Sequence, residues 1–390
     1  MAKISKIKAR QILDSRGEWT IEVRLKTSDG KEAVASVPQG KSTGSHEARA
    51  VPARDGVRNI EKIIGPKLKR KDPLKQKGID DFLIKLDGTL LKKRLGGNAM
   101  LGVSMAVARA GAFSKGAPLW KHLRDVSDSR VSGGKFPRLY INVVNGGLHA
   151  GNNLDFQEYM VIPKSRAIAE SVGAGTAVYR ALGNYLAKTR GAQARNLGDE
   201  GGYAPDFKNN LEPFGVLKKV VKSLGLEGKV DFGMDAAASG VKISGKKLFS
   251  LYTRMEKNFG LIYLEDPFGE EEFGEFAKLK SAFGSRALVA GDDLTTTNVS
   301  RMRLAEAQKS VNAVIIKPNQ IGTVSEALEA VKLARQYGWA VVASHRSGET
   351  NDDFIADFAY GVGADGLKLG SPARGERVAK YNRLLEIGGL

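Results

Sequence analysis

Six ionisable side chains in the second part of the chain each stand at or next to the end of a short apolar run. They are Asp235, Glu265, Asp292, Lys317, His345 and Lys368, and they follow one another at intervals of 23 to 30 residues. This interval fits one strand plus one helix, and in α/β barrels the carboxyl ends of the strands carry the active site. One charged residue after a strand commonly faces solvent, but three successive acids followed by two lysines and a histidine indicate a catalytic site.

Three carboxylates that converge in this way are suited to a hard cation. Mg²⁺ and Mn²⁺ prefer oxygen ligands and keep coordination positions open for substrate. The chain has no cysteine and only 4 histidines, which excludes thiolate-bound zinc, iron–sulfur clusters and disulfides.

A lysine beside such a cation gains a chemical role. Nearby positive charge lowers the pKa of a lysine from about 10.4 toward neutrality, so that it can act as a general base. Lys317 and Lys368 are the candidates. A metal and a lysine base together predict proton abstraction beside a carboxylate, because the metal stabilises the enediolate that forms.

Eight short apolar runs, with helical patterns between them, must position these residues. Most of the runs are apolar enough to be buried on both faces, as parallel strands are. A (β/α)8 barrel needs eight such strands. The runs are residues 139–145, 157–163, 230–235, 261–266, 287–293, 311–317, 339–345 and 364–370. We therefore predict an α/β protein in which residues 137–390 form a catalytic, TIM-like (β/α)8 barrel.

The first part of the chain predicts a separate N-terminal α+β capping domain over residues 1–130. Residues 3–15 and 20–38 have the pattern of antiparallel strands, and an Asp29-Gly30 turn joins the second pair as a hairpin. An Ala-rich helix follows Asn98, a candidate N-cap, and breaks at residues 116–118. Serine and glycine in residues 127–137 indicate a linker between the two domains.

The chain is strongly basic, and the excess is uneven. It has 61 Lys and Arg against 43 Asp and Glu, a net charge of +18. Residues 1–135 carry 29 bases against 14 acids, a net of +15, and the rest of the chain is nearly neutral. The densest stretch, residues 62–94, has few aromatics for stacking on nucleic-acid bases. It fits either a solvated basic face or a surface for RNA or another anionic partner.

The composition, with 42% hydrophobic and 27% charged residues, is typical of a globular protein and excludes a disordered or collagen-like chain. No segment has the apolar core of a signal peptide or the length of a membrane span. We therefore expect a cytoplasmic protein without membrane insertion, which leaves room for surface or secreted pools.

Seven sequence strings, in order along the chain, resemble the motifs of the enolase family, the phosphopyruvate hydratases of glycolysis. They are PQGKSTGSHEA (38–48), NVVNGGLHAGNNLDFQEYM (142–160), NLGDEGGYAP (196–205), LEDPF (264–268), GDDLTTTN (291–298), IIKPNQIGT (315–323) and SHRSGET (344–350). The resemblance extends from residue 14 to residue 387. It implies reversible, Mg²⁺-dependent dehydration of 2-phosphoglycerate to phosphoenolpyruvate, by a homodimer or a larger homo-oligomer.

The resemblance also implies two metal ions in each active site. Asp235, Glu265 and Asp292 would bind the first Mg²⁺, which takes the substrate carboxylate. The second Mg²⁺ would arrive with substrate and use Ser42, which lies in a mobile loop rich in small residues that closes over the ligand.

The implied acid–base groups are Lys317, Glu200 and Glu158. Lys317 would remove the C2 proton, and Glu200, assisted by Glu158, would protonate the departing C3 hydroxyl. A neighbouring carboxylate such as Glu158 is one means of keeping Glu200 protonated near neutral pH. The other implied contacts are Lys368 with the substrate carboxylate, Arg346 and Ser347 with its phosphate, and His149, His345 and Gln157 in the same site.

Three other functions compete with this interpretation. GKST at 40–43 ends like a phosphate-binding P-loop, but Ala35 replaces a required glycine and Pro38 interrupts the loop, so an NTPase is not expected. A second alternative is a catalytically weak enolase-like protein that binds RNA through its basic N-terminal domain, and the intact acid, base and metal set argues against it. A third is another lyase or racemase of the superfamily, whereas KPNQIGT and SHRSGET favour a phosphorylated substrate.

Several positions depart from the usual enolase pattern. Glu18-Trp19 replaces Asn-Pro, Gln39 and Lys41 replace the commoner Ser and Ala in the lid, and AAASGVK follows Asp235 where Ser-Glu-aromatic is usual. Lys41 matters most, because its charge beside the second metal's ligand is expected either to repel Mg²⁺ or to contact the substrate phosphate.

Overall fold

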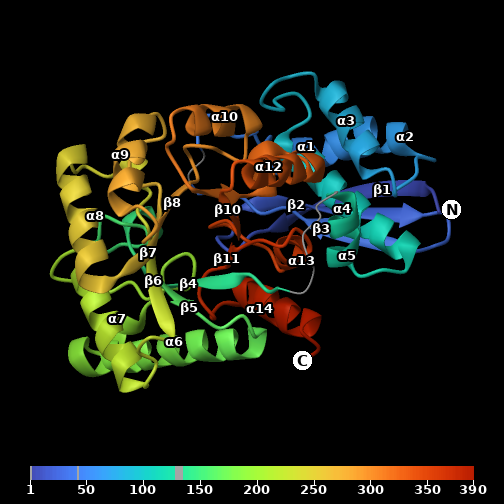
Figure 1. The fold of residues 1–390 in the computed structure, drawn as a ribbon. Coiled ribbons are helices and arrows are strands. Elements are labelled where there is room, and N and C mark those ends of the chain that lie inside the picture. The colour runs from blue at the N-terminus through green and yellow to red at the C-terminus, as the bar shows by residue number, and fades with distance from the viewer. Residues whose placement is uncertain (1, 42–43, 128–134) are drawn as a thin grey trace.

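The computed structural model describes residues 2–41, 44–127 and 135–390. Figure 1 shows a sheet with helices at the N-terminal end of the molecule and a ring of strands surrounded by helices beyond it. Most of the predicted linker, residues 128–134, lies outside the described residues, as does Ser42.

The N-terminal sheet has three antiparallel strands in the order β1-β2-β3. The strands are β1 (Ile4–Leu13), β2 (Trp19–Thr27) and β3 (Glu32–Ser36). Val23 and Leu25 of β2 are buried and Arg24 is exposed, as expected for a sheet with one covered face. Gly30 has φ +85°, a left-handed conformation that suits the turn between β2 and β3. The predicted hairpin is confirmed.

Helices cover one face of this sheet. Those in contact with the strands are α1 (Ala53–Asn59), the π-helical turn η1 (Ile60–Ile64), α2 (Gly65–Leu68) and α4 (Gly97–Lys115). The helices α3 (Gln76–Asp87) and α5 (Leu119–Val126) pack against α4. The predicted break after α4 is confirmed, since Gly116 ends the helix in a left-handed conformation.

The prediction that Asn98 caps α4 is wrong. The helix begins at Gly97, and its N-cap position is Gly96. The Asn98 side chain instead binds the backbone of Val51, accepting from its N–H at 3.1 Å and donating to its C=O at 2.8 Å. Asn98 therefore ties the helix to a neighbouring loop.

The second part of the chain is a closed barrel of eight strands, as predicted. The strands are β4 (Arg138–Asn145), β5 (Glu158–Pro163), β6 (Val230–Asp235), β7 (Leu261–Glu265), β8 (Leu288–Gly291), β9 (Ala313–Ile316), β10 (Ala340–Ser344) and β11 (Gly366–Lys368). β5 runs antiparallel to both of its neighbours, and the other neighbouring pairs are parallel. The β4–β5 connection contains only the short 3₁₀ turn η2 (Gly147–His149), and without a crossover helix two adjacent strands pair antiparallel.

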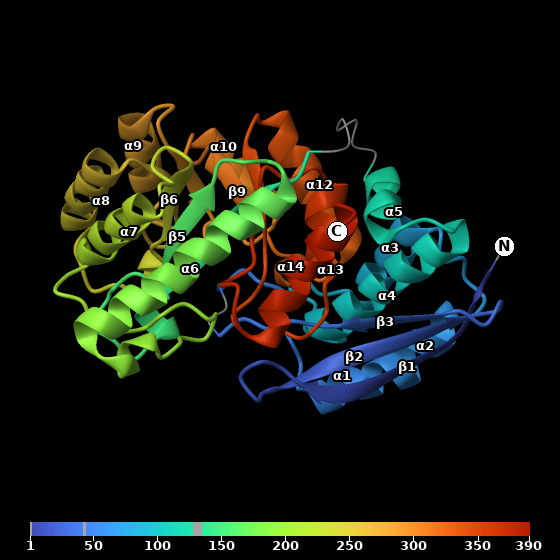
Figure 2. The ribbon, with the colours of Figure 1, turned by 90° about the horizontal axis from the view of Figure 1, so that it is seen from below.

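Helices surround the barrel (Figure 2). The longer ones are α6 (Ile168–Arg190), α7 (Glu212–Ser223), α8 (Gly245–Phe259), α9 (Phe273–Phe283), α10 (Val299–Ala307), α12 (Val324–Gln336), α13 (Phe354–Gly361) and α14 (Gly375–Ile387), and α11 (Pro318–Ile321) is a single turn. No described helix is both long enough and apolar enough to cross a bilayer.

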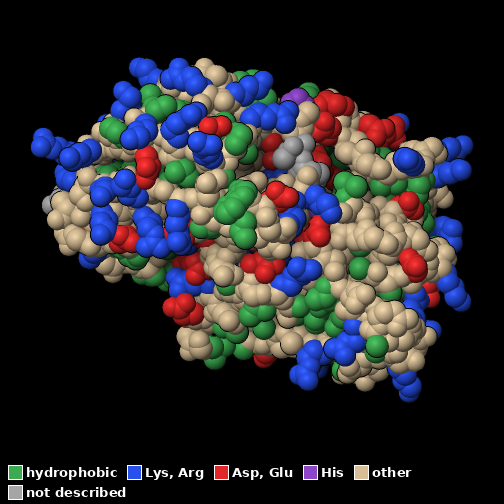
Figure 3. All heavy atoms as spheres, turned by 180° about the vertical axis from the view of Figure 1, so that it is seen from behind, with side chains coloured by type: hydrophobic (Ala, Val, Ile, Leu, Met, Phe, Trp, Pro, Cys, Tyr) green, Lys and Arg blue, Asp and Glu red, His purple; other side chains and the backbone are tan. Residues whose placement is uncertain are grey.

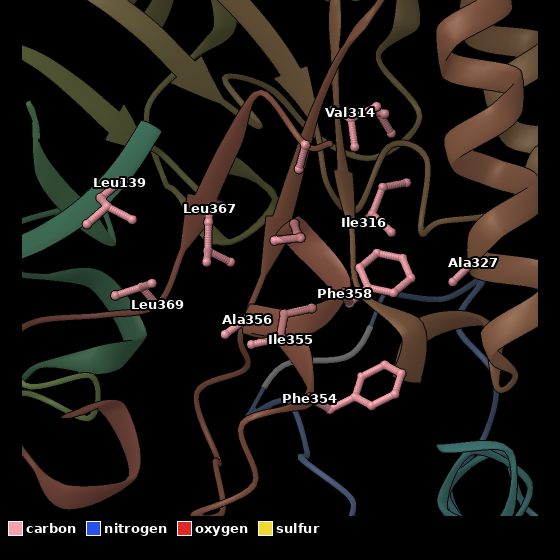
Figure 4. Close-up of a cluster of buried hydrophobic side chains, with 14 of the residues drawn as sticks. Leu139, Val314, Ile316, Ala327, Phe354, Ile355, Ala356, Phe358, Leu367 and Leu369 are labelled. Carbon is pink, nitrogen blue, oxygen red and sulfur yellow. The ribbon is translucent and has the colours of Figure 1, made fainter. Parts of the chain in front are cut away.

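Side chains of the barrel strands alternate between two hydrophobic layers. Ile315 of β9 joins a cluster with Tyr140 and Tyr263, whereas Val314 and Ile316 join the cluster that contains the surrounding helices. Figure 4 shows part of that outer cluster, where Ile316 of β9 lies beside Phe358 of α13. Both layers exclude water and hold the strand ends rigidly.

Buried polar contacts join the N-terminal part to the barrel. Arg109 of α4 binds Asp352, with nitrogen–oxygen distances of 2.7 and 2.8 Å. The Asp80 carboxylate of α3 accepts hydrogen bonds from the backbone and hydroxyl of Ser325 at the start of α12. The barrel mouth is thus fixed against residues from the first part of the chain.

Candidate active site

The structure brings all six strand-end side chains to one mouth of the barrel. Asp235, Glu265 and Lys368 end β6, β7 and β11. Asp292, Lys317 and His345 directly follow β8, β9 and β10. The pocket at this mouth is lined by all of these side chains except the fully buried Glu265, and by six of the other predicted residues, His149, Gln157, Glu158, Glu200, Arg346 and Ser347.

Glu158 reaches this mouth because β5 is reversed. It is the first residue of β5 and is paired in register with Asp235, the last residue of β6. In a parallel strand the first residue would lie at the opposite end of the barrel. The antiparallel strand therefore adds a carboxylate to the site.

Lys368 is the centre of a buried carboxylate cluster. Its Nζ lies 3.1 Å from Glu158 Oε1, 3.1 Å from Asp235 Oδ2 and 2.8 Å from Glu265 Oε2. Burial lowers the pKa of Lys368, but Asp235 and the two glutamates outweigh it and hold the pKa well above its usual range. Its three carboxylate neighbours thus hold Lys368 as a positive charge.

Glu265 is held by two neighbours. Tyr263 donates to its Oε2 at 2.6 Å, and Lys368 contacts both of its oxygens. Burial and the adjacent Asp235 raise the pKa of Glu265 to about 8, against the opposing effect of Lys368. The neighbouring Asp235 is also held, because Gln157 Nε2 donates to its Oδ2 at 3.1 Å.

Lys317 forms a close ion pair with Asp292. Burial lowers the pKa of Lys317, but Asp292 outweighs it, and the pKa of Lys317 is raised. The predicted shift toward neutrality is therefore not produced by the protein groups alone. Gln320 also binds Asp292, donating at 2.8 Å, so this carboxylate is fixed from two sides.

Glu158 and Glu200 form a second buried group with His345. One carboxylate oxygen from each glutamate and one ring nitrogen of His345 lie within 4.8 Å of one another. Burial and the Glu200 carboxylate raise the pKa of Glu158 well above its usual range. Burial also acts to raise the pKa of Glu200, but His149 and His345 outweigh it, and the pKa of Glu200 lies well below its usual range. Their neighbours thus shift the two pKa values in opposite directions, and the expectation that Glu200 is the acid stays a prediction.

Arg346 and Ser347 follow His345 in the loop after β10. Arg346 forms a two-point contact with the buried Glu47 carboxylate, at 2.9 and 3.1 Å, and contacts Asn319 at 3.1 Å. Sequence reasoning missed Glu47 as a partner, although it lies inside the motif at 38–48. The Arg346 guanidinium, fixed by Glu47, presents a positive charge to the pocket.

The departures in the lid are close to this loop. Gln39 and Gly348 exchange two backbone hydrogen bonds of 2.8 Å, and the Lys41 N–H donates to the Ser347 hydroxyl at 2.7 Å. Lys41 Nζ contacts Asp199 Oδ2 at 2.8 Å and the Leu148 carbonyl at 2.6 Å. The Lys41 charge is therefore paired with Asp199, and the predicted metal ligand Ser42 lies outside the described residues.

The predicted metal ligands Asp235, Glu265 and Asp292 stand at three adjacent strand ends, and Asp235 and Glu265 pair in register. Among the described residues, however, the three carboxylates whose oxygens lie within 4.8 Å of one another at this mouth are Asp266, Asp292 and Asp293, so only Asp292 of the predicted set belongs to that group. Carboxylate oxygens of this kind suit a hard cation. The buried Asp266 accepts hydrogen bonds from the Asp292 and Asp293 backbones at 2.8 and 2.7 Å and fixes the turn that carries Asp292. Sequence reasoning missed Asp266, and the only available signal was its place in LEDPF.

Known proteins resemble this chain over nearly its whole length. A family model for the enolase N-terminal domain matches residues 4–123, and one for the enolase C-terminal TIM barrel domain matches residues 135–242 and 239–389. Enolase of Solanum lycopersicum is 42% identical, and the alignment covers 99% of this chain and 95% of that protein. Enolase of Methanopyrus kandleri is 43% identical, with coverage of 99% and 96%.

Proposed function

This chain belongs to the enolase family, and we propose how its residues carry out the hydro-lyase reaction of that family, the interconversion of 2-phosphoglycerate and phosphoenolpyruvate. One observation carries the assignment of roles. A single pocket combines a buried lysine on a carboxylate, Lys317 on Asp292, with two buried carboxyl groups, Glu158 and Glu200, whose pKa values are shifted in opposite directions.

We propose that Lys317 accepts the proton from C2 and that the Glu158–Glu200 pair supplies the proton with which the C3 hydroxyl leaves as water. Lys317 must be neutral when it accepts the proton, and Asp292 opposes this. Asp235, Glu265 and Asp292 would hold Mg²⁺, whose charge, when bound, neutralises these carboxylates and stabilises negative charge on the substrate. A second Mg²⁺ bound with substrate, with Ser42 as a ligand, is part of the same proposal.

The remaining residues bind and orient the substrate. Lys368 is the fixed positive charge for its carboxylate, and Arg346 and Ser347 receive its phosphate, for which a planar guanidinium offers paired donors. His149, His345 and Gln157 line the same pocket. Together these groups give a small, highly anionic substrate a single orientation.

The test is the formation of phosphoenolpyruvate, followed by its absorbance, from 2-phosphoglycerate and Mg²⁺. We expect turnover by the wild-type protein, its loss with a chelator and its return with added Mg²⁺. Lys317→Ala should reduce kcat by about 10²- to 10⁴-fold, the usual contribution of a general base. It should also abolish exchange of the C2 proton with deuterated solvent. Wild-type exchange in a Lys317→Ala protein would contradict the proposed base.

Assembly as a homodimer, working in the cytoplasm, is the expectation from the family. Leu13 and Trp19 face each other across the end of the β1–β2 pair and are 55% and 59% exposed, which gives this end of the sheet an apolar surface. A mass of two chains by light scattering is the expected result, and a mass of one chain would contradict it.

The basic N-terminal region supports a second, separate capacity, binding to a nucleic-acid backbone. Eight exposed cations, here called the basic surface, have no carboxylate partner within the part of the chain that the structure describes: Arg54, Lys62, Lys67, Lys69, Arg70, Lys75, Lys85 and Lys93. The acids of the same segment are buried or already paired, as Glu61 is with Lys8 and Asp72 with Lys3. Lys and Arg side chains outnumber Asp and Glu on the face in Figure 3.

Fluorescence anisotropy with duplex RNA at two salt concentrations tests this capacity. Changing Lys67, Lys69, Arg70 and Lys75 to Gln should weaken binding by about tenfold or more and reduce its salt dependence, because fewer phosphates are neutralised. The matched control changes four exposed lysines on and near α7, Lys218, Lys219, Lys222 and Lys229, to Gln. Equal loss of RNA affinity in both variants would show that binding depends on the net charge of the protein and not on the basic surface.

A further inference from the structure

Arg377 of α14 contacts the active-site loop with most of its guanidinium. Its side chain has 0% exposure. Nη1 donates to His345 Nδ1 at 2.9 Å and to the Arg346 carbonyl at 2.7 Å. Nη2 donates to the Ser347 carbonyl at 2.6 Å and to the Asp199 carbonyl at 3.4 Å. One side chain therefore binds three consecutive site residues and the residue before Glu200.

The partners of this buried charge are unusual. Arg377 donates mainly to carbonyls, and its Nε lies 3.7 Å from the nearest described carboxylate oxygen, that of Glu376. One turn later, Lys380 also binds carbonyls but has a carboxylate partner, Glu349, at 2.9 Å. A buried charge is costly when no close counter-ion is present.

The contact with His345 determines which ring nitrogen carries the proton. A guanidinium has only donors, so His345 Nδ1 must accept and cannot bear hydrogen. Burial and the Arg377 charge also hold the pKa of His345 well below its usual range, so the ring is neutral. Its single proton is then on Nε2, which lies 3.8 Å from Glu200 Oε1.

Close packing leaves this arrangement little freedom. Gly370 has φ +78°, and a Cβ at this position would lie 3.1 Å from both Arg377 Cδ and His345 Cε1 and 2.9 Å from the Glu200 carbonyl. The glycine allows the guanidinium, the imidazole and the Glu200 backbone to meet.

We propose that Arg377 is a positioning residue of this active site, which fixes His345 as the Nε2–H tautomer facing Glu200 and holds the Arg346 and Ser347 backbone for the substrate phosphate. The roles of Glu200, Arg346 and Ser347 in this inference rest on the proposed function. The tautomer does not, because it follows from the donor and acceptor chemistry alone.

Nitrogen NMR of protein labelled at histidine tests the tautomer without any turnover. The chain has only 4 histidines, and a His345→Asn variant identifies the signals of His345. We expect an unprotonated Nδ1 and a protonated Nε2 in the wild-type protein near neutral pH. In Arg377→Met this signature should be lost. A protonated Nδ1 in the wild-type protein would overturn the inference, whether or not the protein is an enolase.

Kinetics separate positioning from a merely structural role. Arg377→Met should lower kcat/KM by about 100-fold, the effect of a small misplacement of reacting groups, with a fall in kcat and a rise in KM. The matched control is Arg383→Met on the same helix, which breaks the part-buried contact with Asp357 and should affect stability but neither kcat nor the His345 signals.

A second variant covers the case in which Arg377→Met does not fold. Arg377→Lys keeps the buried charge, but one ammonium cannot reach all four acceptors, so a clear loss of kcat/KM should remain. Wild-type kinetics in a folded Arg377→Lys or Arg377→Met protein would overturn the positioning role. Absence of turnover in the wild-type protein with the expected His345 signals would instead contradict the proposed function.

Discussion

Glu158 and Glu200 are side chains of the same type whose pKa values are shifted in opposite directions by their neighbours. Both are buried, so burial alone would favour the protonated form of each. The two histidines face Glu200 and stabilise its carboxylate, and Asn142 donates to it at 3.0 Å. Burial and Glu200 raise the pKa of Glu158, against the opposing effect of Lys368. Within the described residues, Glu158 Oε2 is buried without a hydrogen-bond partner.

Glu200→Gln should separate the two halves of the reaction. The amide cannot accept or pass the proton, so we expect dehydration to fall by about 10²- to 10⁴-fold, while exchange of the C2 proton with deuterated solvent continues because Lys317 is intact. Proton NMR of 2-phosphoglycerate in deuterated buffer measures the exchange, and absorbance of phosphoenolpyruvate measures dehydration. A Glu200→Gln protein that loses both would contradict the division of roles.

The residues at the strand ends could be predicted from the sequence because each follows its own apolar run. The partners that set their properties could not. Glu47 and Arg346 are separated by 299 residues, and Asp235 and Lys368 by 133. The raised pKa of Lys317 likewise depends on how close its Nζ lies to an oxygen of Asp292, and a sequence pattern does not give the distance between these two atoms.

At the scale of elements, the reversal of β5 is what local sequence could not reveal. After Glu158 its residues are apolar, and all of them are buried, so they are equally suited to a parallel or an antiparallel strand. The direction is set by the short connection from β4. The strand count and the two N-terminal hairpin strands were predictable, because each depends on a run of a few residues and its turn.

The contact between α3, α4 and α12 contains an acid that opposes folding at neutral pH. Asp80 is fully buried, and burial raises its pKa above the usual range. Within the described residues, its Oδ1 and the neighbouring Gln76 Oε1 are buried without a hydrogen-bond partner. A group whose pKa is raised on folding contributes stability below its unfolded pKa, about 3.9, and loses it as the pH rises through the folded value.

Asp80→Asn should therefore stabilise the protein at neutral pH. The amide oxygen can still accept from Ser325, and the amide nitrogen can donate to Gln76. We expect the free energy of unfolding to rise by about 1–3 kcal/mol, the cost of a buried group without its partner, near pH 8 and to change little near pH 4. Urea unfolding at both pH values measures this. A lower stability of Asp80→Asn at pH 8 would contradict it.

At the scale of the whole molecule, the excess positive charge lies in one part of the chain, whereas the polar contacts join its two parts. The excess charge lies in the first third of the chain, away from the nearly neutral barrel. The contacts that join the two parts are buried and paired, as between Arg109 and Asp352 and between Ser15 and Glu349. Since the loop that carries Arg346 lies between the two parts, we expect them to unfold together.

Arg109→Met tests whether the contact with Asp352 holds the two parts of the chain together. The guanidinium binds both oxygens of the buried Asp352 and also contacts Asp353 at 2.9 Å. Its removal leaves a buried carboxylate without its partner, so the free energy of unfolding should fall by roughly 3–5 kcal/mol near pH 7. Calorimetry should show one transition in the wild-type protein and one, at lower temperature, in the variant.

The pH dependence of this effect has a definite sign. Burial acts to raise the pKa of Asp352, but Arg109 outweighs it, and the pKa of Asp352 is lowered. A lowered carboxyl pKa contributes stability above the unfolded value, about 3.9, which is lost as the pH falls through the folded value. The difference in free energy of unfolding between wild type and Arg109→Met should thus be full near pH 7 and shrink in the acid range.

Lys77→Met, which removes an exposed helix pair with Asp81, is the control and should lower the free energy of unfolding by less than about 1 kcal/mol. Two separate transitions in the wild-type protein would contradict unfolding as one unit, and an Arg109→Met protein as stable as the control would contradict the importance of this pair.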